Sequence, residues 1–339
     1  MFNKKKSVSS DRKTKSTIFG INSGIVITLL LIAPIIFTMI ISLHSFNLSW
    51  NAGRGDFLFV MVFIAAELIG LKQKIDKKKL YAIIGLLSLT IGYFVAIEYK
   101  IPLGLKESIR NSAPIYNVQL IDSWIIMWDF IIMTVYVGLC LVILYGKKWY
   151  KIAPAGLIFL AGTAAILSLD AFFPQDTLGL LQYIVPVYLQ IDEGVIRFID
   201  SSIMDFGPDS HLVTARDNTL TLNGLNGSIR LTVFWPSAGV HSMIIYSLLM
   251  LIFLLKMKIP FKRKLAYFLI GTIGTTMVNI VRIISLSLFA LIVSADYIVW
   301  QPFHSIAGVI IFLPWLFIYL YSVICLENRL ARKLQMLRI

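Results

Sequence analysis

Three polar residues stand in or beside apolar parts of this 339-residue sequence, and their types fit acyl transfer. Ser237 lies in the stretch WPSAGVHS (235–242), Arg282 lies inside a long apolar run, and His304 opens the next run. Histidine ionises near neutral pH and is the usual base that takes the proton of a serine hydroxyl. A guanidinium can stabilise the oxyanion of a tetrahedral intermediate. The set therefore predicts a nucleophile, an oxyanion stabiliser and a base.

Two further residues could support this chemistry. His241 follows Ser237 by four residues, so both share one helix face, and His241 is the rival base. Asn279 precedes Arg282 by three residues and shares its face. Asn279 could therefore orient the guanidinium, or it could hydrogen-bond a neighbouring helix.

Each of the three main residues also has a structural alternative. Ser237 could simply cap the helix that follows it. Arg282 could snorkel to the outer membrane interface, or it could pair with Asp129 or Asp296 and hold helices together. His304 could cap its own helix at the membrane interface. The sequence alone leaves these alternatives open.

The elements that carry these residues are predicted to be membrane-spanning helices. Hydrophobic residues make up 58% of the chain and charged residues only 14%, which leaves too little polar surface for a water-soluble globule. A crossing of about 30 Å of hydrocarbon requires roughly 20 apolar residues. We expect an all-α polytopic membrane protein, a bundle of about eight transmembrane helices, over 18–43, 57–71, 80–99, 122–146, 152–170, 240–255, 265–293 and 304–325.

The charge pattern predicts the orientation of these helices. The net charge is +13, and most Lys and Arg residues fall in short segments that share one side if all eight helices cross. Because such loops are cytoplasmic, we expect a multi-pass protein of the cell membrane with both termini in the cytoplasm. The basic residues form no single patch, so nucleic acid is not an expected partner. The basic segments are the N-terminal tail, 72–79, 147–151, 256–264 and the tail from 326.

Helix rise places the three residues at one depth. Arg282 follows the cytoplasmic Lys264 by 18 residues, a climb of about 27 Å at 1.5 Å per residue. That is close to the outer edge of the hydrocarbon. Ser237 and His304 border that same outer edge, so we expect the three side chains to meet there.

The largest segment outside the membrane is expected at 171–236. Its first part, 177–207, has apolar residues at helical spacing and is interrupted by Pro186, which is typical of an interfacial or re-entrant helix; a crossing by 177–201 stays open. Two Asn-Gly pairs at 223–224 and 226–227 predict a β-hairpin. The predicted organisation is a cytoplasmic basic tail (1–17), five transmembrane helices (18–170), an extracytoplasmic segment (171–236), a catalytic three-helix region (237–325) and a second cytoplasmic basic tail (326–339).

Three short motifs, WPSAGVHS, NIVR (279–282) and FHSIAG (303–308), resemble the exosortase and archaeosortase family in order and depth. The similarity is greatest to the thaumarchaeosortase branch, in which serine replaces the family's cysteine. The resemblance implies a polytopic transpeptidase in which Ser237, Arg282 and His304 take the Cys, Arg and His roles. It also implies exported substrates with a C-terminal sorting signal, made of a short motif, a membrane span and a basic cluster, and transfer of the new C-terminus to a lipid or other acceptor.

Ser237 departs from most of that family, because an alcohol is harder to ionise than a thiol. Hydrolysis and transpeptidation therefore both stay open. No cofactor or metal motif occurs in the sequence, and membrane lipids are expected partners. Two other classes of function remain: a non-catalytic membrane scaffold that binds partners through the outer segment, and a transporter whose path is lined by Arg282, Glu67 and Asp129.

Overall fold

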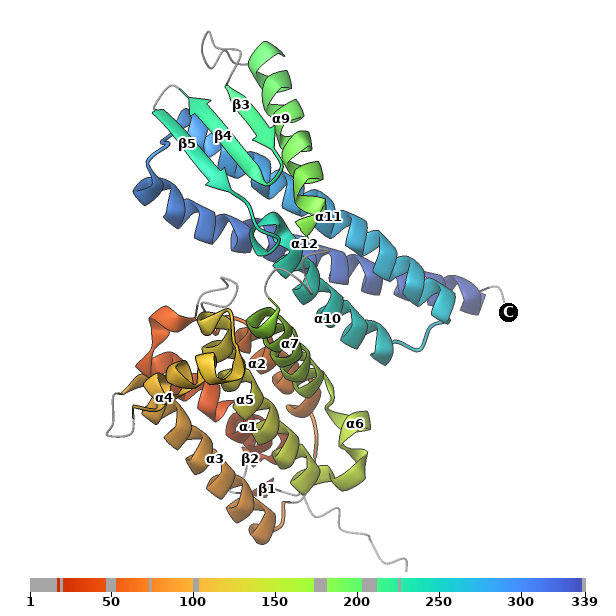
Figure 1. The fold of residues 1–339 in the computed structure, drawn as a ribbon. Coiled ribbons are helices and arrows are strands. Elements are labelled where there is room, and N and C mark those ends of the chain that lie inside the picture. Colours follow the sequence, from red (N-terminus) through yellow and green to blue (C-terminus); the bar gives the residue numbers. More distant parts are fainter. Residues whose placement is uncertain are drawn as a thin grey trace, which may run out of the picture.

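The computed structural model of the protein describes residues 17–18, 21–46, 53–72, 75–99, 104–173, 182–202, 212–224 and 227–336. Helices dominate the fold, and a small sheet lies at one end (Figure 1). The α-helices are α1 (Ser23–Ile41), α2 (Phe57–Leu68), α3 (Lys77–Glu98), α4 (Leu105–Ser112), α5 (Ile121–Tyr145), α6 (Trp149–Ile152), α7 (Ala155–Phe172), α9 (Ile184–Ser202), α10 (His241–Lys256), α11 (Phe261–Ile292) and α12 (Tyr297–Met336). Short helical turns are η1 (Leu43–Ser45), η2 (Ala113–Tyr116), η3 (Gly146–Lys148) and η4 (Pro236–Val240). The strands are β1 (Thr17–Ile18), β2 (Ile21–Asn22), β3 (Val213–Arg216), β4 (Thr219–Gly224) and β5 (Gly227–Thr232).

Seven helices of the described part are long and apolar enough to cross a membrane: α1, α3, α5 with its continuation into α6, α7, α10, α11 and α12. A chain with so many such helices is a multi-pass membrane protein, which confirms the predicted all-α polytopic class.

The second predicted span is shorter than expected. The apolar helix α2 has 12 residues, about 18 Å at 1.5 Å per residue, less than the roughly 30 Å of a bilayer core. A continuous span over 57–71 is therefore the wrong description of this segment.

The contacts of α2 nevertheless join the two ends of the bundle. Arg54, just before α2, pairs with Glu98 at the end of α3. Glu67, near the other end of α2, pairs with Lys256 at the end of α10 and accepts a hydrogen bond from the backbone of Ala155 at the start of α7. The helix α2 therefore brings the chain from one end of the bundle back to the other. For this reason α1, α2 and α3 still alternate in direction, as the predicted spans do.

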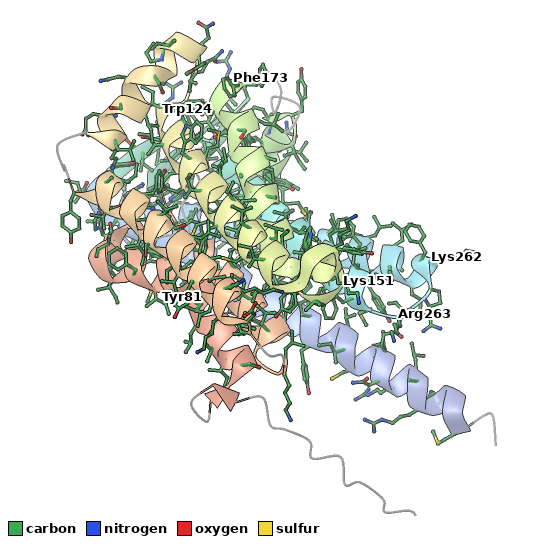
Figure 2. All side chains as sticks on the ribbon, turned by 90° about the horizontal axis from the view of Figure 1, so that it is seen from below. Tyr81, Trp124, Lys151, Phe173, Lys262 and Arg263 are labelled. Carbon is green, nitrogen blue, oxygen red and sulfur yellow. The ribbon has the colours of Figure 1, made fainter. Side chains whose placement is uncertain are left out.

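The basic loops gather at one end of the molecule. Figure 2 shows Lys151, Lys262 and Arg263 at one end of the bundle, and Trp124 and Phe173 at the opposite end. We refer to these as the basic end and the opposite end. The helix order places the start of α10 at the opposite end and Lys256 at the basic end.

Two hydrophobic cores hold the fold together. The larger core joins α1, α2, α3, α5 and α7 to α10 and to the basic-end halves of α11 and α12. The smaller core packs α9 and the sheet against the other half of α11 and the start of α12, through residues such as Leu189, Leu222, Leu286 and Trp300. At 32 residues, about 48 Å, α11 is longer than a bilayer core is thick, so it can carry the second core beyond the membrane.

The predicted interfacial helix is α9, which is not among the spanning helices. The predicted interruption falls at the start of α9, which begins at Ile184 after a turn at Tyr183. Pro186 lies in the first turn of this helix, where a backbone N–H has no acceptor within the helix, so proline is tolerated there. The flanking parts of the predicted segment, 174–181 and 203–211, lie outside the described residues.

The predicted hairpin is present as β4 and β5, and a third strand precedes it. β3, β4 and β5 form an antiparallel sheet in that order. The tight turn between β3 and β4 contains Asp217 at φ 53°, a left-handed conformation that Asp and Asn tolerate. The Asn-Gly pairs predicted only the second turn, which is why β3 was missed.

Asp192 is a buried carboxyl in the smaller core. It is fully buried and accepts a hydrogen bond of 2.8 Å from Ser287 Oγ of α11. Burial raises the pKa of Asp192 to about 6, although the Ser287 bond opposes this rise. The folded state therefore binds the proton more tightly than the unfolded chain, in which the pKa is about 3.9. Stability falls as the pH rises from about 4 to about 6.

Replacing Asp192 by Asn is expected to stabilise the protein at pH 7.5 by about 1 to 3 kcal/mol and to have little effect near pH 4, because the amide never carries the buried charge. Denaturant unfolding in detergent at both pH values measures this difference. The control is Asp217→Asn, at an exposed turn position. An equal gain at both pH values would show that burial of charge is not the cause.

Candidate active site

The stretch that contains Ser237 forms a wide helical turn, η4, directly before α10. Gly239 in this turn has φ 93°, a conformation that favours glycine. Asn279 Nδ2 of α11 donates a hydrogen bond of 2.8 Å to the Gly239 carbonyl, and a Cβ on Gly239 would lie 2.2 Å from Asn279 Cγ. The backbone of Ser237 is thereby held against α11; its side chain lies outside the described part of the structure.

Asn279 thus has a different partner from the one predicted first. Its amide donates a hydrogen bond to the turn η4, which matches the alternative that Asn279 bonds a neighbouring helix. Other residues must therefore orient Arg282. Since Asn279 and Arg282 are one turn apart on α11, η4 lies close to the guanidinium along this helix.

Arg282 and His304 come together between α11 and α12. Arg282 Nη2 lies 3.5 Å from His304 Nε2. Gly308, one turn after His304, lies beside the guanidinium: a Cβ there would be 3.3 Å from Arg282 Cζ. The small residue of the FHSIAG motif therefore leaves room for the arginine that the NIVR motif supplies.

Neither predicted carboxylate partner of Arg282 is near it. Asp129 pairs with Arg54, and Asp296 accepts a hydrogen bond from the backbone of Ile298 at the start of α12. Among the described residues, no carboxylate lies within ion-pair distance of Arg282. The structural role predicted for this arginine, an ion pair that holds helices together, is therefore wrong for the partners considered.

His304 lies inside α12, not at its start. The helix begins at Tyr297, about two turns earlier, so His304 is not a capping residue. The Trp300 ring stacks on the imidazole at 4.9 Å between centroids, and Trp300 Nε1 donates a hydrogen bond of 3.2 Å to the Leu286 carbonyl. Trp300 fixes the plane of the imidazole.

Trp300 is the site residue that the sequence did not identify. Its type and position near a helix end are typical of the aromatic belt at a membrane interface. The structure buries it, with only 6% of its surface exposed. The available signal was its spacing: Trp300 precedes His304 by four residues and so shares its face.

Three buried polar atoms in this region have no hydrogen-bond partner among the described residues: Asn279 Oδ1, Arg282 Nε and His304 Nδ1. Buried polar atoms are paired in the great majority of cases. This acceptor, this charged donor and this imidazole nitrogen, on the neighbouring helices α11 and α12, could bind a polar substrate group.

His241, the rival base, faces the N-terminal helices. Its Nε2 lies 3.8 Å from Asp56 Oδ2, just before α2. The helix α10 therefore carries His241 toward α2, while Asn279 holds the preceding turn against α11.

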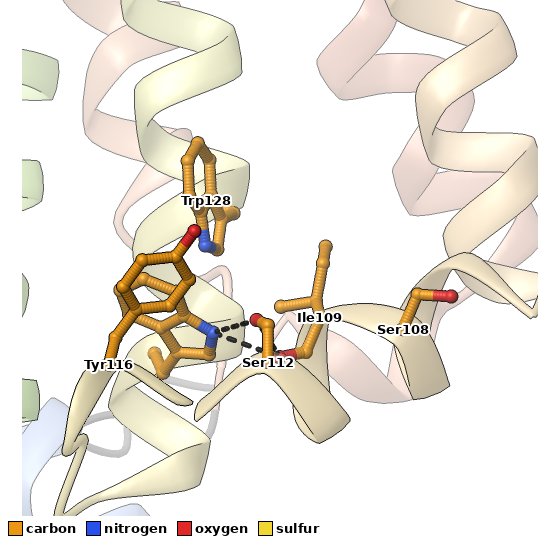
Figure 3. A pocket seen from close by; sticks show the side chains of 6 residues that line it. Ser108, Ile109, Ser112, Tyr116 and Trp128 are labelled. Atoms are coloured by element: carbon orange, nitrogen blue, oxygen red, sulfur yellow. Dashed lines mark hydrogen bonds between the residues drawn. The ribbon is translucent and has the colours of Figure 1, made fainter. Parts of the chain in front are cut away.

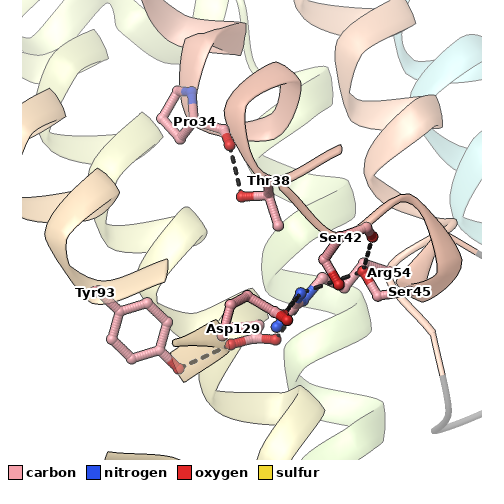
Figure 4. Close-up of polar contacts among 8 residues, drawn as sticks. Pro34, Thr38, Ser42, Ser45, Arg54, Tyr93 and Asp129 are labelled. Atoms are coloured by element: carbon pink, nitrogen blue, oxygen red, sulfur yellow. Dashed lines mark hydrogen bonds and ion pairs between the residues drawn. The ribbon is translucent and has the colours of Figure 1, made fainter. Parts of the chain in front are cut away.

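A separate polar cluster explains the carboxylates inside the bundle. Arg54 donates to Asp129 Oδ2 at 2.7 Å and also bonds Glu98, while Tyr93 OH donates to Asp129 Oδ1 at 2.9 Å (Figure 4). Glu67 is likewise engaged, by Lys256 and the Ala155 backbone. Glu67 and Asp129, the two carboxylates assigned to a transport path, are therefore engaged in contacts that tie helices together.

A cavity of about 510 Å³ lies at the corner between α4 and α5. Trp124 Nε1 donates hydrogen bonds to the Ile109 carbonyl and to Ser112 Oγ, and these bonds join α5 to α4 beside the cavity (Figure 3). No residue of the three motifs lines it, so we do not assign it to the same site. Its lining residues are Ser108, Ile109, Ser112, Tyr116, Trp124 and Trp128.

No protein-family model, no curated protein and no solved structure matches this chain.

Proposed function

We propose that this protein is a membrane-embedded protein-sorting transpeptidase or protease. The observation that carries the proposal is the environment of Arg282: the guanidinium has no carboxylate partner among the described residues, touches His304, and lies one helical turn from the residue that holds the Ser237 turn. A cation without a counter-charge inside a membrane-spanning helix costs free energy, and such a residue is usually retained for a function.

In the proposed reaction, Ser237 Oγ attacks the carbonyl carbon of the scissile peptide bond. His304 takes the hydroxyl proton and gives it to the leaving amine, so that an acyl ester forms and the C-terminal fragment departs. Arg282 stabilises the oxyanion of the tetrahedral intermediate. Water or the amine or hydroxyl of an acceptor then attacks the ester, again deprotonated by His304, and releases Ser237.

The proposed substrates are exported proteins whose C-terminal signal combines a short motif, a membrane span and a basic cluster. The proposed location is the cell membrane, with both termini in the cytoplasm and the site facing outward. Support comes from the positive-inside rule, since Lys151, Lys262 and Arg263 lie together at the basic end, while η4 precedes α10 at the opposite end (Figure 2).

A serine-reactive fluorophosphonate tests the nucleophile. It is expected to label the wild-type protein at Ser237 and to leave the Ser237→Ala variant unlabelled, because only an activated serine reacts at a useful rate. In cells, the same variant should accumulate the full-length precursor of an exported protein. The matched control is Ser242→Ala, on α10 one turn beyond the candidate site.

Labelling that persists in Ser237→Ala would remove Ser237 as the nucleophile. Normal processing in that variant and in a Ser237→Ala, Arg282→Ala, His304→Ala triple variant would favour a non-catalytic scaffold instead.

A further inference from the structure

The sheet beside the candidate site has two edges that the fold treats differently. β3 and β5 are the edge strands, and β4 lies between them (Figure 1). An edge strand presents backbone N–H and C=O groups that can pair with another chain, so proteins usually cover or block such edges.

The edge of β3 is covered by α9. The register with β4 turns the backbone groups of Val213 and Ala215 outward. Arg197 Nη2 donates to the Val213 carbonyl at 2.9 Å, and the Ala215 N–H donates to Glu193 Oε2 at 2.9 Å. Two side chains of α9 therefore occupy this edge in place of a fourth strand.

The edge of β5 has no such cover. Gly224 pairs with Gly227, and Val233 N–H donates to the Asn218 carbonyl, so β5 bonds β4 through alternate residues. The backbone groups of the remaining residues, Ser228, Arg230 and Thr232, point away from β4. All three residues are exposed, and their backbone groups accept or donate no hydrogen bond to any described residue outside the sheet.

The open edge leads directly to the candidate site. The end of β4 lies over the end of α11, where a Cβ on Gly224 would be 2.5 Å from the Leu291 carbonyl oxygen. The other end of β5 continues into η4, which is bound by Asn279. Asn279 precedes Leu291 by 12 residues on α11, a distance of about 18 Å along the helix. β5 therefore runs along α11 toward Ser237 and Arg282.

The link between β5 and η4 is fixed in place. Gln182 Nε2 donates to the Val233 carbonyl at 3.0 Å, and Gln182 Oε1 accepts from the Trp235 N–H at 2.8 Å. Trp235 itself is buried. A chain aligned along β5 would therefore hold a constant position relative to η4.

We propose that the free edge of β5 binds the substrate polypeptide as an added fourth strand. Ser228, Arg230 and Thr232 pair with the extended segment beside the scissile bond and deliver it to Ser237. This inference rests on the proposed peptidase function. Main-chain pairing gives affinity to any extended segment, while exposed side chains beside it supply selectivity.

A proline at position 230 tests this proposal, because it removes only an outward N–H and leaves the β4 ladder intact. The reference is Arg230→Ala, which removes the same side chain but keeps the N–H. The substrate is the precursor that accumulates with Ser237→Ala. Arg230→Pro is expected to process it at least about tenfold more slowly than Arg230→Ala does, because one main-chain hydrogen bond is lost and the proline ring obstructs strand pairing. Both variants are expected to show the same fluorophosphonate labelling.

The possible outcomes separate the two proposals. Equal processing by the proline and alanine variants overturns strand addition, whereas absence of labelling in the wild-type protein overturns the peptidase function. A change of oligomeric state with Arg230→Pro, measured by light scattering, would assign the edge to a second copy of this chain and also overturn the proposal.

A second measurement does not depend on the proline variant folding. Arg230→p-benzoylphenylalanine in a Ser237→Ala background is expected to crosslink the precursor within a few residues of its cleavage site. The same probe at Asp217, in the turn at the covered edge, should give no such product. A crosslink only at Asp217 would contradict the proposal.

Discussion

Replacing His304 by Gln is expected to slow processing of the exported precursor about 10³-fold, because the amide can still hydrogen-bond Arg282 but cannot accept the serine proton. The measurement is the fraction of precursor processed with time in membrane vesicles. The variant should unfold at the same denaturant concentration as the wild type, since Gln is close to His in size and keeps the contact with Trp300.

The comparison with His241→Gln decides between the two bases. His241 faces Asp56, on the side of α10 that packs against the N-terminal helices, whereas His304 contacts Arg282. We therefore expect a much smaller loss for His241→Gln. A large loss for His241→Gln together with normal processing by His304→Gln would reverse the assignment and make Asp56 the residue that orients the base.

Replacing Arg54 by Leu is expected to destabilise the protein by about 3 to 5 kcal/mol, because it leaves the fully buried Asp129 and the neighbouring Glu98 without their cation. Denaturant unfolding in detergent measures the loss. An Arg54→Leu, Asp129→Leu double variant should recover much of the lost stability. Removing both partners of a buried ion pair costs far less free energy than leaving one buried charge without its counter-charge.

The control for this prediction is Arg263→Leu. Arg263 pairs with Glu327 near the basic end, and its side chain is 40% exposed, so its loss should cost less than about 1 kcal/mol. Equal losses for Arg54→Leu and Arg263→Leu would mean that the buried cluster is not a main support of the N-terminal helices.

The positions of the helices could be predicted closely from the sequence, because a bilayer requires long apolar runs and each run is a local property. The one misjudged run, 57–71, shows the limit of this rule. Contacts of Arg54 and Glu67 with other helices let a 12-residue helix connect the two ends of the bundle, and hydropathy contains no information about such partners.

For the candidate site, the sequence supplied the residue types and their approximate depth. Helix rise along α11 and the order of the motifs predicted that Arg282 and His304 would be close, and the structure confirms the contact at 3.5 Å. Rise gives height along one axis but not the direction in which a side chain points. For that reason the sequence could not tell His304 from His241 as the neighbour of Arg282, nor Arg54 from Arg282 as the partner of Asp129.

What the sequence determined by itself is therefore what depends on neighbouring residues: the length of the apolar runs, the basic loops, and the hairpin of β4 and β5. Only the tertiary structure decided which groups are paired and which are left free. Trp300 lies on His304, α9 covers the edge of β3, and the edge of β5 stays open. The physical reason is that hydrogen bonds and ion pairs act over a few ångströms, so they are set by how helices distant in the sequence pack together.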